Sequence, residues 1–333
     1  MGNYYIRRTA RVFATIFLVA SLTFGLIRLL PGGPFTMLRA RLLKSGVPAS
    51  EVDARIANLQ NIQPDAPIWE QYINYMLSAM RGDFGRSIKL GEPVSQIIAE
   101  AVPWTVFVVL VSTVLIFVFG ILLGAIQAYW EGSRFDQLVS GLSISLMSIP
   151  FYVVAVLSLF IVAYQLQWLP TAGTVGTDVE TGLTLEFFVS ALRHAALPIF
   201  SYTIGGIGGQ ALAMRGNSIQ VLGNDYVEVA RLRGLSDRRI ATWYVARNAI
   251  LPMYTGFLLL LGFRLGGTII LERIFSYPGL GWYLWSALKA NDYPLMMGTF
   301  LVITVALVIG VYIADLTYSK IDPRISRGES DAY

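Results

Sequence analysis

Six long apolar stretches in this chain of 333 residues restrict what it can fold into. A helix needs roughly 20 apolar residues to cross about 30 Å of hydrocarbon, because it rises about 1.5 Å per residue. The stretches that meet this length are 12–30, 102–128, 138–164, 195–214, 251–271 and 295–318. The sequence therefore predicts an all-α, polytopic membrane protein with six transmembrane helices.

The composition supports the same class of fold. Hydrophobic residues make up 55% of the chain and charged residues 14%, against about 25% charged residues in soluble domains. The fourth stretch also carries four glycines between positions 205 and 209, and small residues let helices approach closely in bilayers. We therefore expect this stretch to pack closely against neighbouring helices.

Basic residues predict the orientation of the chain. Three arginines between positions 7 and 11 precede the first span, which runs on to Leu30 without a persuasive cleavage site, so we expect a retained helix. With the N-terminus in the cytoplasm, 13 basic residues lie on that side. The short outward segments 165–194 and 272–294 hold three, which satisfies the positive-inside rule. We therefore expect both termini to be cytoplasmic.

The segment 31–101 is too long to be a bare connection between two spans. Two amphipathic helical patterns lie in it, followed by the turn-rich residues 81–87. The patterns are Val52, Ile56 and Leu59, and then Ile68, Tyr72, Tyr75 and Ala79. The predicted organisation is an N-terminal helix (1–30), an extracytoplasmic cap (31–101), a transmembrane domain (102–319) with a cytoplasmic loop (215–251), and a cytoplasmic tail (320–333).

The polar segment 224–252 lies between two apolar spans and holds five arginines. The spacing i, i+3, i+4 and i+7 occurs twice and predicts two short helices, one through Val227, Ala230, Arg231 and Gly234 and one through Ile240, Trp243, Tyr244 and Arg247. Gly234 is placed to end the first helix, because glycine accepts a positive φ without a Cβ clash. Ser236 is placed to N-cap the second helix, and Pro252 suits the first turn of the next span. We expect a compact basic knob, formed by residues 224–252, that projects from the membrane.

The amino-acid sequence of the knob resembles the EAA loop of membrane subunits of binding-protein-dependent ABC importers. The residues that carry the resemblance are Glu228-Val229-Ala230, Gly234-Leu235 and the run RNAILP at 247–252, with Val229 where the motif's name has Ala. Elsewhere RLLPGGP at 28–34, GDFGRS at 82–87 and ERIFSYPGLG at 272–281 resemble the dipeptide/oligopeptide permease branch. The resemblance covers nearly the whole chain.

This resemblance implies a type I ABC importer (MetI-like) fold in the inner or plasma membrane of a prokaryotic cell. It implies a permease subunit that forms half of a translocation pathway, with a second homologous permease, two cytoplasmic ATP-binding subunits and an extracytoplasmic solute-binding protein as partners. In such permeases the knob docks in a groove of the ATPase, which assigns coupling to Glu228, Ala230, Arg231, Arg233, Gly234, Leu235 and Ser236. The cargo stays open among peptides, nickel and sugars.

The sequence lacks the motifs and residue types that several other functions require. No GxxxxGK[ST] phosphate loop occurs, so we expect no cofactor on this chain and expect ATP and Mg to be used by the partner ATPases. One histidine and no cysteine argue against a metal site and against an enzyme. Basic residues beside apolar spans do not form a nucleic-acid surface. The alternative is an ion-coupled secondary transporter, which would need intramembrane carboxylates or broken helices.

Arg264 is the charged residue that least fits a plain transmembrane helix. It lies 12 residues beyond Pro252, or roughly 18 Å along a helix, which places it near the bilayer middle. A charge there costs about 2.5–3.5 kcal/mol on insertion scales, so we do not expect it to face lipid. One hypothesis is that Arg264 lines the substrate path and binds an anionic group of the cargo. The alternative is a hydrogen bond to carbonyls near the glycines, or to the partner permease.

Overall fold

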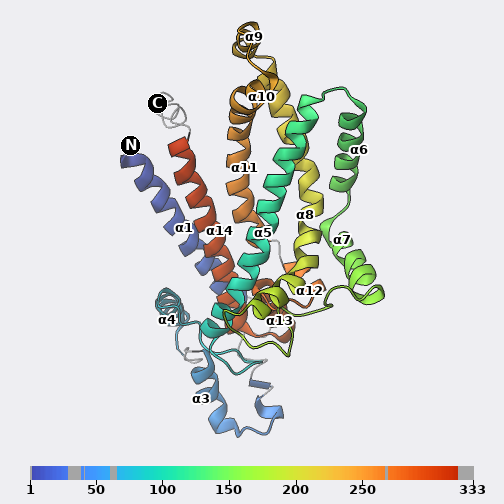
Figure 1. Cartoon of the computed structure of the whole chain (residues 1–333). Coiled ribbons are helices and arrows are strands. Elements are labelled where there is room, and N and C mark those ends of the chain that lie inside the picture. The colour runs from blue at the N-terminus through green and yellow to red at the C-terminus, as the bar shows by residue number, and fades with distance from the viewer. Residues whose placement is uncertain (1, 29–38, 41, 61–65, 267–268, 322–333) are drawn as a thin grey trace. The chain divides into compact units, whose positions relative to one another are not determined.

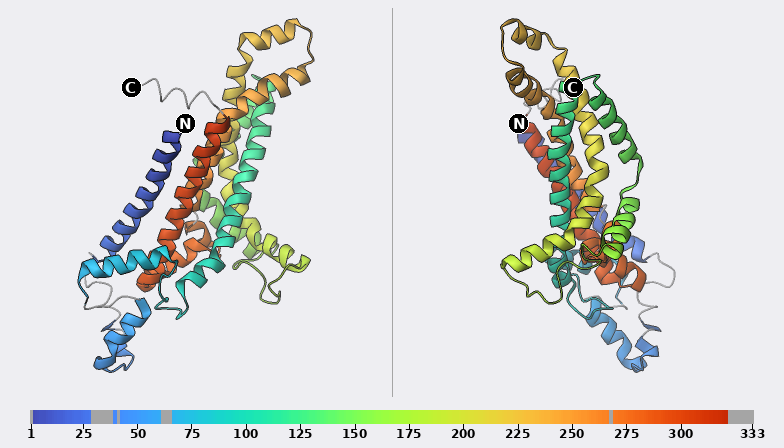
Figure 2. Two further views of the ribbon diagram at one scale, coloured as in Figure 1. Left: turned by 90° about the vertical axis from the view of Figure 1, so that its left-hand side faces the viewer. Right: turned by 45° about the vertical axis from the view of Figure 1, so that its right-hand side comes forward.

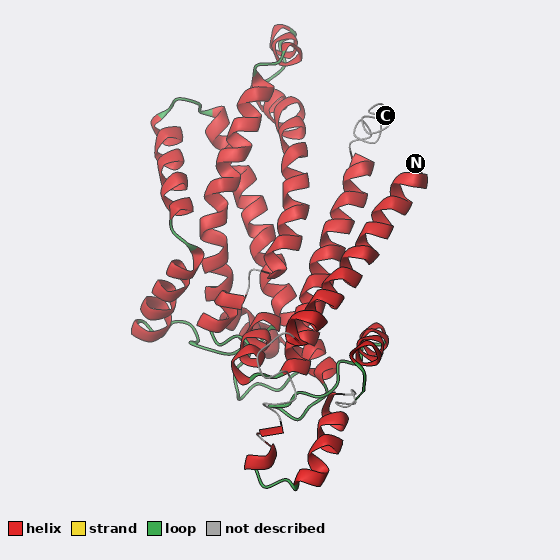
Figure 3. Ribbon diagram, turned by 180° about the vertical axis from the view of Figure 1, so that it is seen from behind, coloured by secondary structure: helices red, strands yellow, loops and turns green. Residues whose placement is uncertain are grey.

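The structure is a computed structural model that describes residues 2–28, 39–40, 42–60, 66–266 and 269–321. Within these ranges the regular elements are helices and no strand occurs (Figures 1 and 3), which confirms the all-α prediction. The helices are α1 Gly2–Arg28, α3 Ala49–Gln60, α4 Ile68–Met80, α5 Val94–Tyr129, α6 Arg134–Ser148, α7 Phe151–Ser158, η1 Leu159–Gln165, α8 Leu185–Leu222, α9 Asp225–Leu232, α10 Asp237–Arg239, η2 Ile240–Ala246, α11 Arg247–Gly266, α12 Ile269–Ile274, α13 Leu280–Ala290 and α14 Tyr293–Ile321.

Contacts divide the chain into two compact units. The first unit comprises Met1–Thr105, Leu265–Arg273 and Pro278–Tyr333. The second comprises Val106–Arg264 and Ile274–Tyr277, and it contains the whole polar segment 224–252. The helices of each unit pack among themselves. The second unit holds the knob and Arg264, and the first holds segment 31–101.

In the second unit, α8 packs closely against α5 and α6 because glycines bring the backbones together. A Cβ on Gly208 would lie 2.7 Å from the carbonyl oxygen of Ser143 in α6. A Cβ on Gly124 of α5 would overlap the carbonyl oxygen of Ala211 in α8. The predicted close approach of the glycine-rich stretch is therefore confirmed at Gly208.

The third predicted span, 138–164, is not one straight helix. The chain bends by 89° between Arg134–Ser148 and Phe151–Gln165. Ile149 is extended, with φ −90° and ψ 117°, because the ring of Pro150 disfavours helical backbone in the residue before it. The predicted stretch 138–164 therefore forms two helices, α6 and α7, instead of one.

Two helices begin earlier than the apolar stretches predicted as spans. α8 begins at Leu185 rather than at 195, because the Thr184 hydroxyl accepts a hydrogen bond from the Phe187 N–H (3.2 Å) and caps the helix earlier. α11 begins at Arg247 and continues directly from η2, so Pro252 is its sixth residue instead of lying in its first turn. Both helices therefore start before the apolar run that they carry.

Four helices among the described residues are long and apolar enough to cross a membrane, namely α1, α5, α8 and α14, and the bent pair adds a fifth candidate. The predicted span 251–271 includes residues 267–268, which lie outside the described ranges, as do 29–30 of the first span and the predicted tail from 322 onward. These helices agree with a polytopic membrane protein. The count of six spans stays a prediction.

In the first unit, α14 packs against α1 and α13. The two amphipathic patterns predicted in segment 31–101 form α3 and α4. Val52 and Ile56 of α3 are buried, while the rings of Tyr72 and Tyr75 in α4 lie 5.5 and 5.6 Å from the ring of Phe24 in α1. The prediction that this segment is structured is confirmed for the residues that are described.

Two buried carboxylates position α13 and α14 in the same unit. Glu272 accepts hydrogen bonds from the Thr105 hydroxyl (2.7 Å) and from the Trp282 N–H (2.9 Å) in the first turn of α13. Asp292, directly before α14, accepts one from the Ser87 hydroxyl (2.5 Å). Carboxylates are favoured at helix N-termini, where backbone N–H groups have no partner within the helix. These contacts explain how acidic side chains are tolerated inside an apolar unit.

Candidate functional site

The knob has a small apolar core of its own. α9 begins three residues after α8 ends and projects past the ends of α8 and α11 (Figures 1 and 2). Val227 and Ala230, on one face of α9, are buried together with Ile240 and Val245 of η2. This core confirms the predicted face at Val227 and Ala230, whereas Arg231 and Gly234 of the same pattern are exposed. It also holds α9 against the following segment.

The turn after α9 is closed by two backbone hydrogen bonds around Gly234. The Gly234 N–H donates to the Arg231 carbonyl (2.9 Å) and the Leu235 N–H donates to the Ala230 carbonyl (3.3 Å). Gly234 has φ +72°, which confirms the predicted left-handed turn. This pair of bonds is a Schellman motif, which satisfies helix carbonyls that otherwise lack a partner. Leu235 then packs on the knob's core, so the turn fixes the direction in which the chain leaves α9.

The second short helix differs from the prediction. α10 spans Asp237–Arg239, and the chain continues as the π-helix η2, whose hydrogen bonds join residues five apart. The 3.6-residue pattern therefore does not hold, and Trp243 is 65% exposed although it was predicted on the face of Ile240. Ser236 stands at the N-cap with extended backbone, but its side chain makes no capping hydrogen bond.

The predicted coupling residues divide between core and surface. Ala230 is buried and Leu235 is half-buried. The exposed ones are Glu228, Arg231, Arg233, Gly234 and Ser236. Glu228 and Arg233 are thus exposed charges of α9 and its turn, whereas Ala230 and Leu235 hold the knob together.

Sequence reasoning missed a second apolar face on α9. Tyr226, Val229 and Leu232 recur every three residues and are 42%, 51% and 81% exposed. Leu232 lies opposite the buried Val227 and Ala230, Val229 lies between, and Tyr226 borders Ala230, so this apolar stripe runs from the edge of the buried face to the exposed side of α9. Exposed apolar patches rimmed by charge mark interaction surfaces. The sequence shows the spacing of these residues, but the structure is needed to tell which apolar residues of α9 are buried and which are exposed.

A buried ion pair that the sequence did not predict fixes the end of α8 that leads into the knob. Arg215 of α8 donates from Nε and Nη2 to the two carboxylate oxygens of Asp136 in α6, at 2.6 and 2.7 Å. Asp136 is 2% exposed and also accepts the Gly132 N–H (3.0 Å). Ser133 caps the same turn by accepting the Asp136 N–H (3.2 Å). A two-point contact of this kind fixes both helices in rotation as well as in distance.

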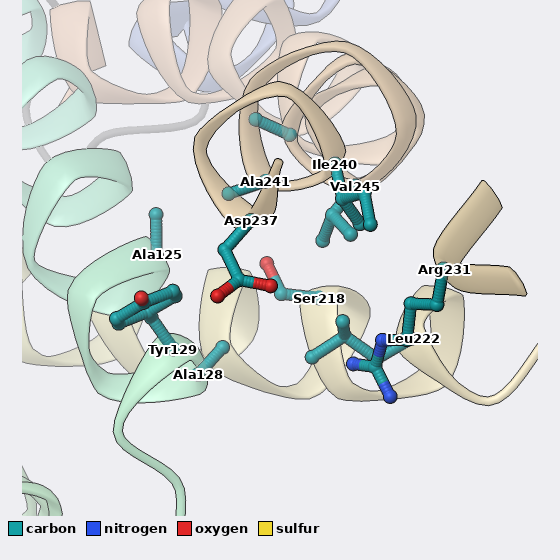
Figure 4. Close-up of a pocket in the computed structure, with 11 residues that line it drawn as sticks. Ala125, Ala128, Tyr129, Ser218, Leu222, Arg231, Asp237, Ile240, Ala241 and Val245 are labelled. Carbon is teal, nitrogen blue, oxygen red and sulfur yellow. The ribbon is translucent and has the colours of Figure 1, made fainter. Parts of the chain in front are cut away.

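A cavity of about 90 Å³ lies where the knob meets the ends of α5 and α8. Figure 4 shows the Asp237 carboxylate reaching into it between Tyr129 of α5 and Ser218 of α8, with Arg231 on another wall. The cavity therefore receives opposite charges from the two short helices of the knob. The joint between the knob and the ends of α5 and α8 therefore contains unfilled space.

Arg264 lies against α8 within the second unit. Its guanidinium carbon is 4.5 Å from the centre of the Tyr202 ring, and its Nη1 donates to the Tyr202 carbonyl (3.4 Å). The Tyr202 hydroxyl donates to the Arg264 carbonyl (3.3 Å). A Cβ on Gly206 would lie 3.0 Å from Nη2, so the glycine leaves room for the guanidinium. These contacts match the alternative in which Arg264 bonds to a carbonyl near the glycines, and a role in the substrate path stays a hypothesis.

Gly234→Val is expected to disturb the turn without disturbing the bundle. Nothing lies within 4 Å of a Cβ at this position, so the cost comes from φ +72° alone, about 1–3 kcal/mol for a β-branched residue. We expect transport to fall while the chain still inserts and assembles, measured as uptake and as ATPase co-purification. Gly216→Val in α8, where a Cβ also meets nothing, is the control. Parental uptake by Gly234→Val would show that the turn is not required.

The fold and the knob define the class of integral-membrane transport subunits. The chain belongs to the family of binding-protein-dependent transport system inner membrane components, whose model matches residues 120–327. It is a permease subunit of an ABC importer, as the resemblance predicted, and the ion-coupled alternative is not favoured. Members of this family are transport components, and membership implies ATPase and binding-protein partners.

Curated relatives match over almost the full length. The oligopeptide transport system permease protein AppB of Bacillus subtilis (strain 168) is 31% identical over 327 residues, 98% of this chain and 99% of the relative. The glutathione transport system permease protein GsiC of Escherichia coli (strain K12) is 31% identical over 329 residues, with the same coverage of 98% and 99%. The similarity therefore includes the N-terminal helix and the segment 31–101, which precede the matched family region.

Proposed function

We propose that this chain is one of two homologous permeases in an importer that also contains two ATP-binding subunits and an extracytoplasmic binding protein. ATP and Mg are bound by the ATPases, because this chain has no phosphate loop of its own. Both termini and the knob face the cytoplasm, and segment 31–101 faces the binding protein. Each permease lines half of the pathway and contributes no catalytic group.

The observation that carries this proposal is the exposed face of α9. Tyr226, Val229 and Leu232 offer an apolar stripe beside the exposed charges of Glu228 and Arg233, which suits an apolar groove with a polar rim. Movement of the ATPases then acts on α9. The Gly234 turn and the knob's core pass that movement to α8, whose end is tied to α6 by the Asp136–Arg215 pair.

We propose small peptides as the cargo. The two relatives that match almost the full chain are named for oligopeptide and glutathione transport, and glutathione is itself a small peptide. Peptides of this size carry a carboxylate at one end and an amine at the other. A binding protein that selects them sets the specificity, while the permease provides a path that tolerates different side chains.

Uptake into vesicles tests the proposal. Inside-facing ATPases, both permeases and the loaded binding protein are reconstituted, and a labelled peptide is followed with ATP, with ADP, or with an imposed proton or sodium gradient. We expect uptake with ATP alone, insensitive to collapse of the ion gradients. Uptake that follows an ion gradient without ATP would overturn the proposal in favour of secondary transport.

Truncating the charges of the knob is expected to weaken ATPase association in a salt-dependent way. Glu228→Ala, Arg231→Ala and Arg233→Ala remove exposed charges, whose interactions are screened beyond about 10 Å at 0.1 M salt. The loss measured by co-purification is therefore largest at low salt, on the order of 0.2–1 kcal/mol for each exposed pair. Equal association of parent and variants at both low and high salt would remove these residues from the interface.

Arg264→Gln is expected to lower uptake of peptides with a free C-terminal carboxylate and to spare the same peptides with an amidated C-terminus. A hydrogen bond between charged groups contributes about 1.5–3 kcal/mol, so the selective loss should be roughly 10- to 100-fold. Tyr202→Leu, which removes the ring that stacks on Arg264, is the control for a purely structural role. If Arg264→Gln lowers the uptake of both peptides equally, or prevents assembly, the contact with Tyr202 is its whole function.

A further inference from the structure

An open cavity of about 330 Å³ lies between α1 and α14 in the first unit. The two helices run side by side and separate toward the N-terminus of α1 (Figures 1 and 3). A hydrogen bond of 2.8 Å between the hydroxyls of Thr9 and Tyr312 bridges them beside the cavity. Pockets that bind small molecules have volumes of about 300 Å³ or more, so this cavity is large enough to hold a ligand.

The walls of this cavity combine positive charge with apolar surface. Arg8 and Arg11 of α1 supply two guanidinium groups, and Val308 and Val311 of α14 are apolar. The remaining lining residues are Val12, Thr15, Leu307 and Tyr312, so none of the described residues that line the cavity is acidic. A ligand that matches both the guanidinium groups and the apolar wall carries a negative group joined to a hydrocarbon chain.

The position along α1 identifies the source of that occupant. The apolar span of α1 runs from Ile6 to Leu26, so Arg8 and Arg11 lie at its end, where a helix meets the phospholipid headgroups. Val12 and Thr15 follow further into the span. The charged end of the cavity is thus at headgroup depth and its apolar wall is at acyl-chain depth.

We propose that this cavity is a binding site for an anionic phospholipid, with the phosphate on Arg8 and Arg11 and an acyl chain along Val12, Val308 and Val311. Guanidinium groups bind phosphate in a bidentate manner, and basic pockets between transmembrane helices are suited to anionic headgroups. A free phosphate ion would gain nothing from the apolar wall. The bound lipid fills the space between α1 and α14, and it stabilises the packing of α1 on α14.

Native mass spectrometry of the full chain, purified with the subunits that assemble with it, tests this proposal. Phosphatidylglycerol and phosphatidylcholine with identical acyl chains are titrated, and we expect one phosphatidylglycerol to be retained at least tenfold more tightly. Arg8→Gln with Arg11→Gln should weaken it roughly 30-fold, since each basic residue near a headgroup contributes about a factor of 5. Arg8→Lys with Arg11→Lys should keep most of the affinity.

The matched control is Arg7→Gln with Arg134→Gln, which removes two exposed positive charges that do not line the cavity and should leave the affinity unchanged. If the double glutamine variant fails to assemble, Val308→Trp decides the question, because it fills the cavity while keeping both arginines. Equal retention of the two lipids, equal loss in the control, or displacement of phosphatidylglycerol by millimolar inorganic phosphate would each overturn the proposal. None of these outcomes depends on uptake, so they are independent of the proposed transport function.

Discussion

Leu232→Asp is expected to remove the ATPase subunits from the purified complex. Leu232 is 81% exposed at the end of α9, so its aliphatic side chain can be buried by a partner. Burying such a side chain contributes about 1.5–3 kcal/mol, or roughly 10- to 150-fold in affinity. Aspartate loses that contribution and also places a charge in an apolar groove, which adds a desolvation cost. The dissociation constant of the ATPase, measured on the detergent-purified permease pair, reports the effect.

The chain provides a matched control for this experiment. Leu185, at the start of α8, is also 81% exposed and lies at the opposite end of that helix from the knob. Leu185→Asp makes the same chemical change and should leave ATPase affinity unaltered. Because the apolar contribution is not screened, the loss in Leu232→Asp should persist at high salt. Equal affinities for the two variants would contradict a docking role for the exposed face of α9.

Local chemistry made the knob's turn predictable from the sequence. Gly234 follows a short amphipathic segment, and a helix end with a positive φ needs no information from the rest of the chain. Segment 31–101 was predictable for a similar reason, because Val52 and Ile56 repeat at the spacing of one helical face. These features depend on residues a few positions apart, which a single sequence displays directly.

Features that depend on distant residues or on unusual helices were not predictable. Asp136 and Arg215 are 79 residues apart, and each reads alone as an ordinary charge at the end of a span. Trp243 was placed on the wrong face, because the sequence gives no sign of the π-helix η2. Pro150 could have predicted the bend, but the apolar stretch 138–164 is long enough for one helix and therefore predicts a single span. Tertiary contact therefore decided the details that position the knob.

Arg215→Ala is expected to destabilise the protein more than Asp136→Ala, although both variants remove the same ion pair. Without Arg215 the carboxylate of Asp136, whose side chain is 3% exposed, stays buried with neutral donors alone. Removing one partner of a buried pair costs about 3–5 kcal/mol, and we expect about 3 kcal/mol here because the Arg215 side chain is 28% exposed. Without Asp136 the Arg215 side chain, already 28% exposed, can turn toward water.

The double variant distinguishes this explanation from a simple loss of contact. Asp136→Ala combined with Arg215→Ala leaves no buried charge, so it should be more stable than Arg215→Ala alone. Thermal denaturation midpoints of the four proteins in one detergent measure the order, and uptake measures its consequence for coupling. Because α8 carries the knob directly after this pair, uptake should follow the same order as stability. Equal losses in the two single variants, adding up in the double variant, would mean that the buried carboxylate is not what makes Arg215 necessary.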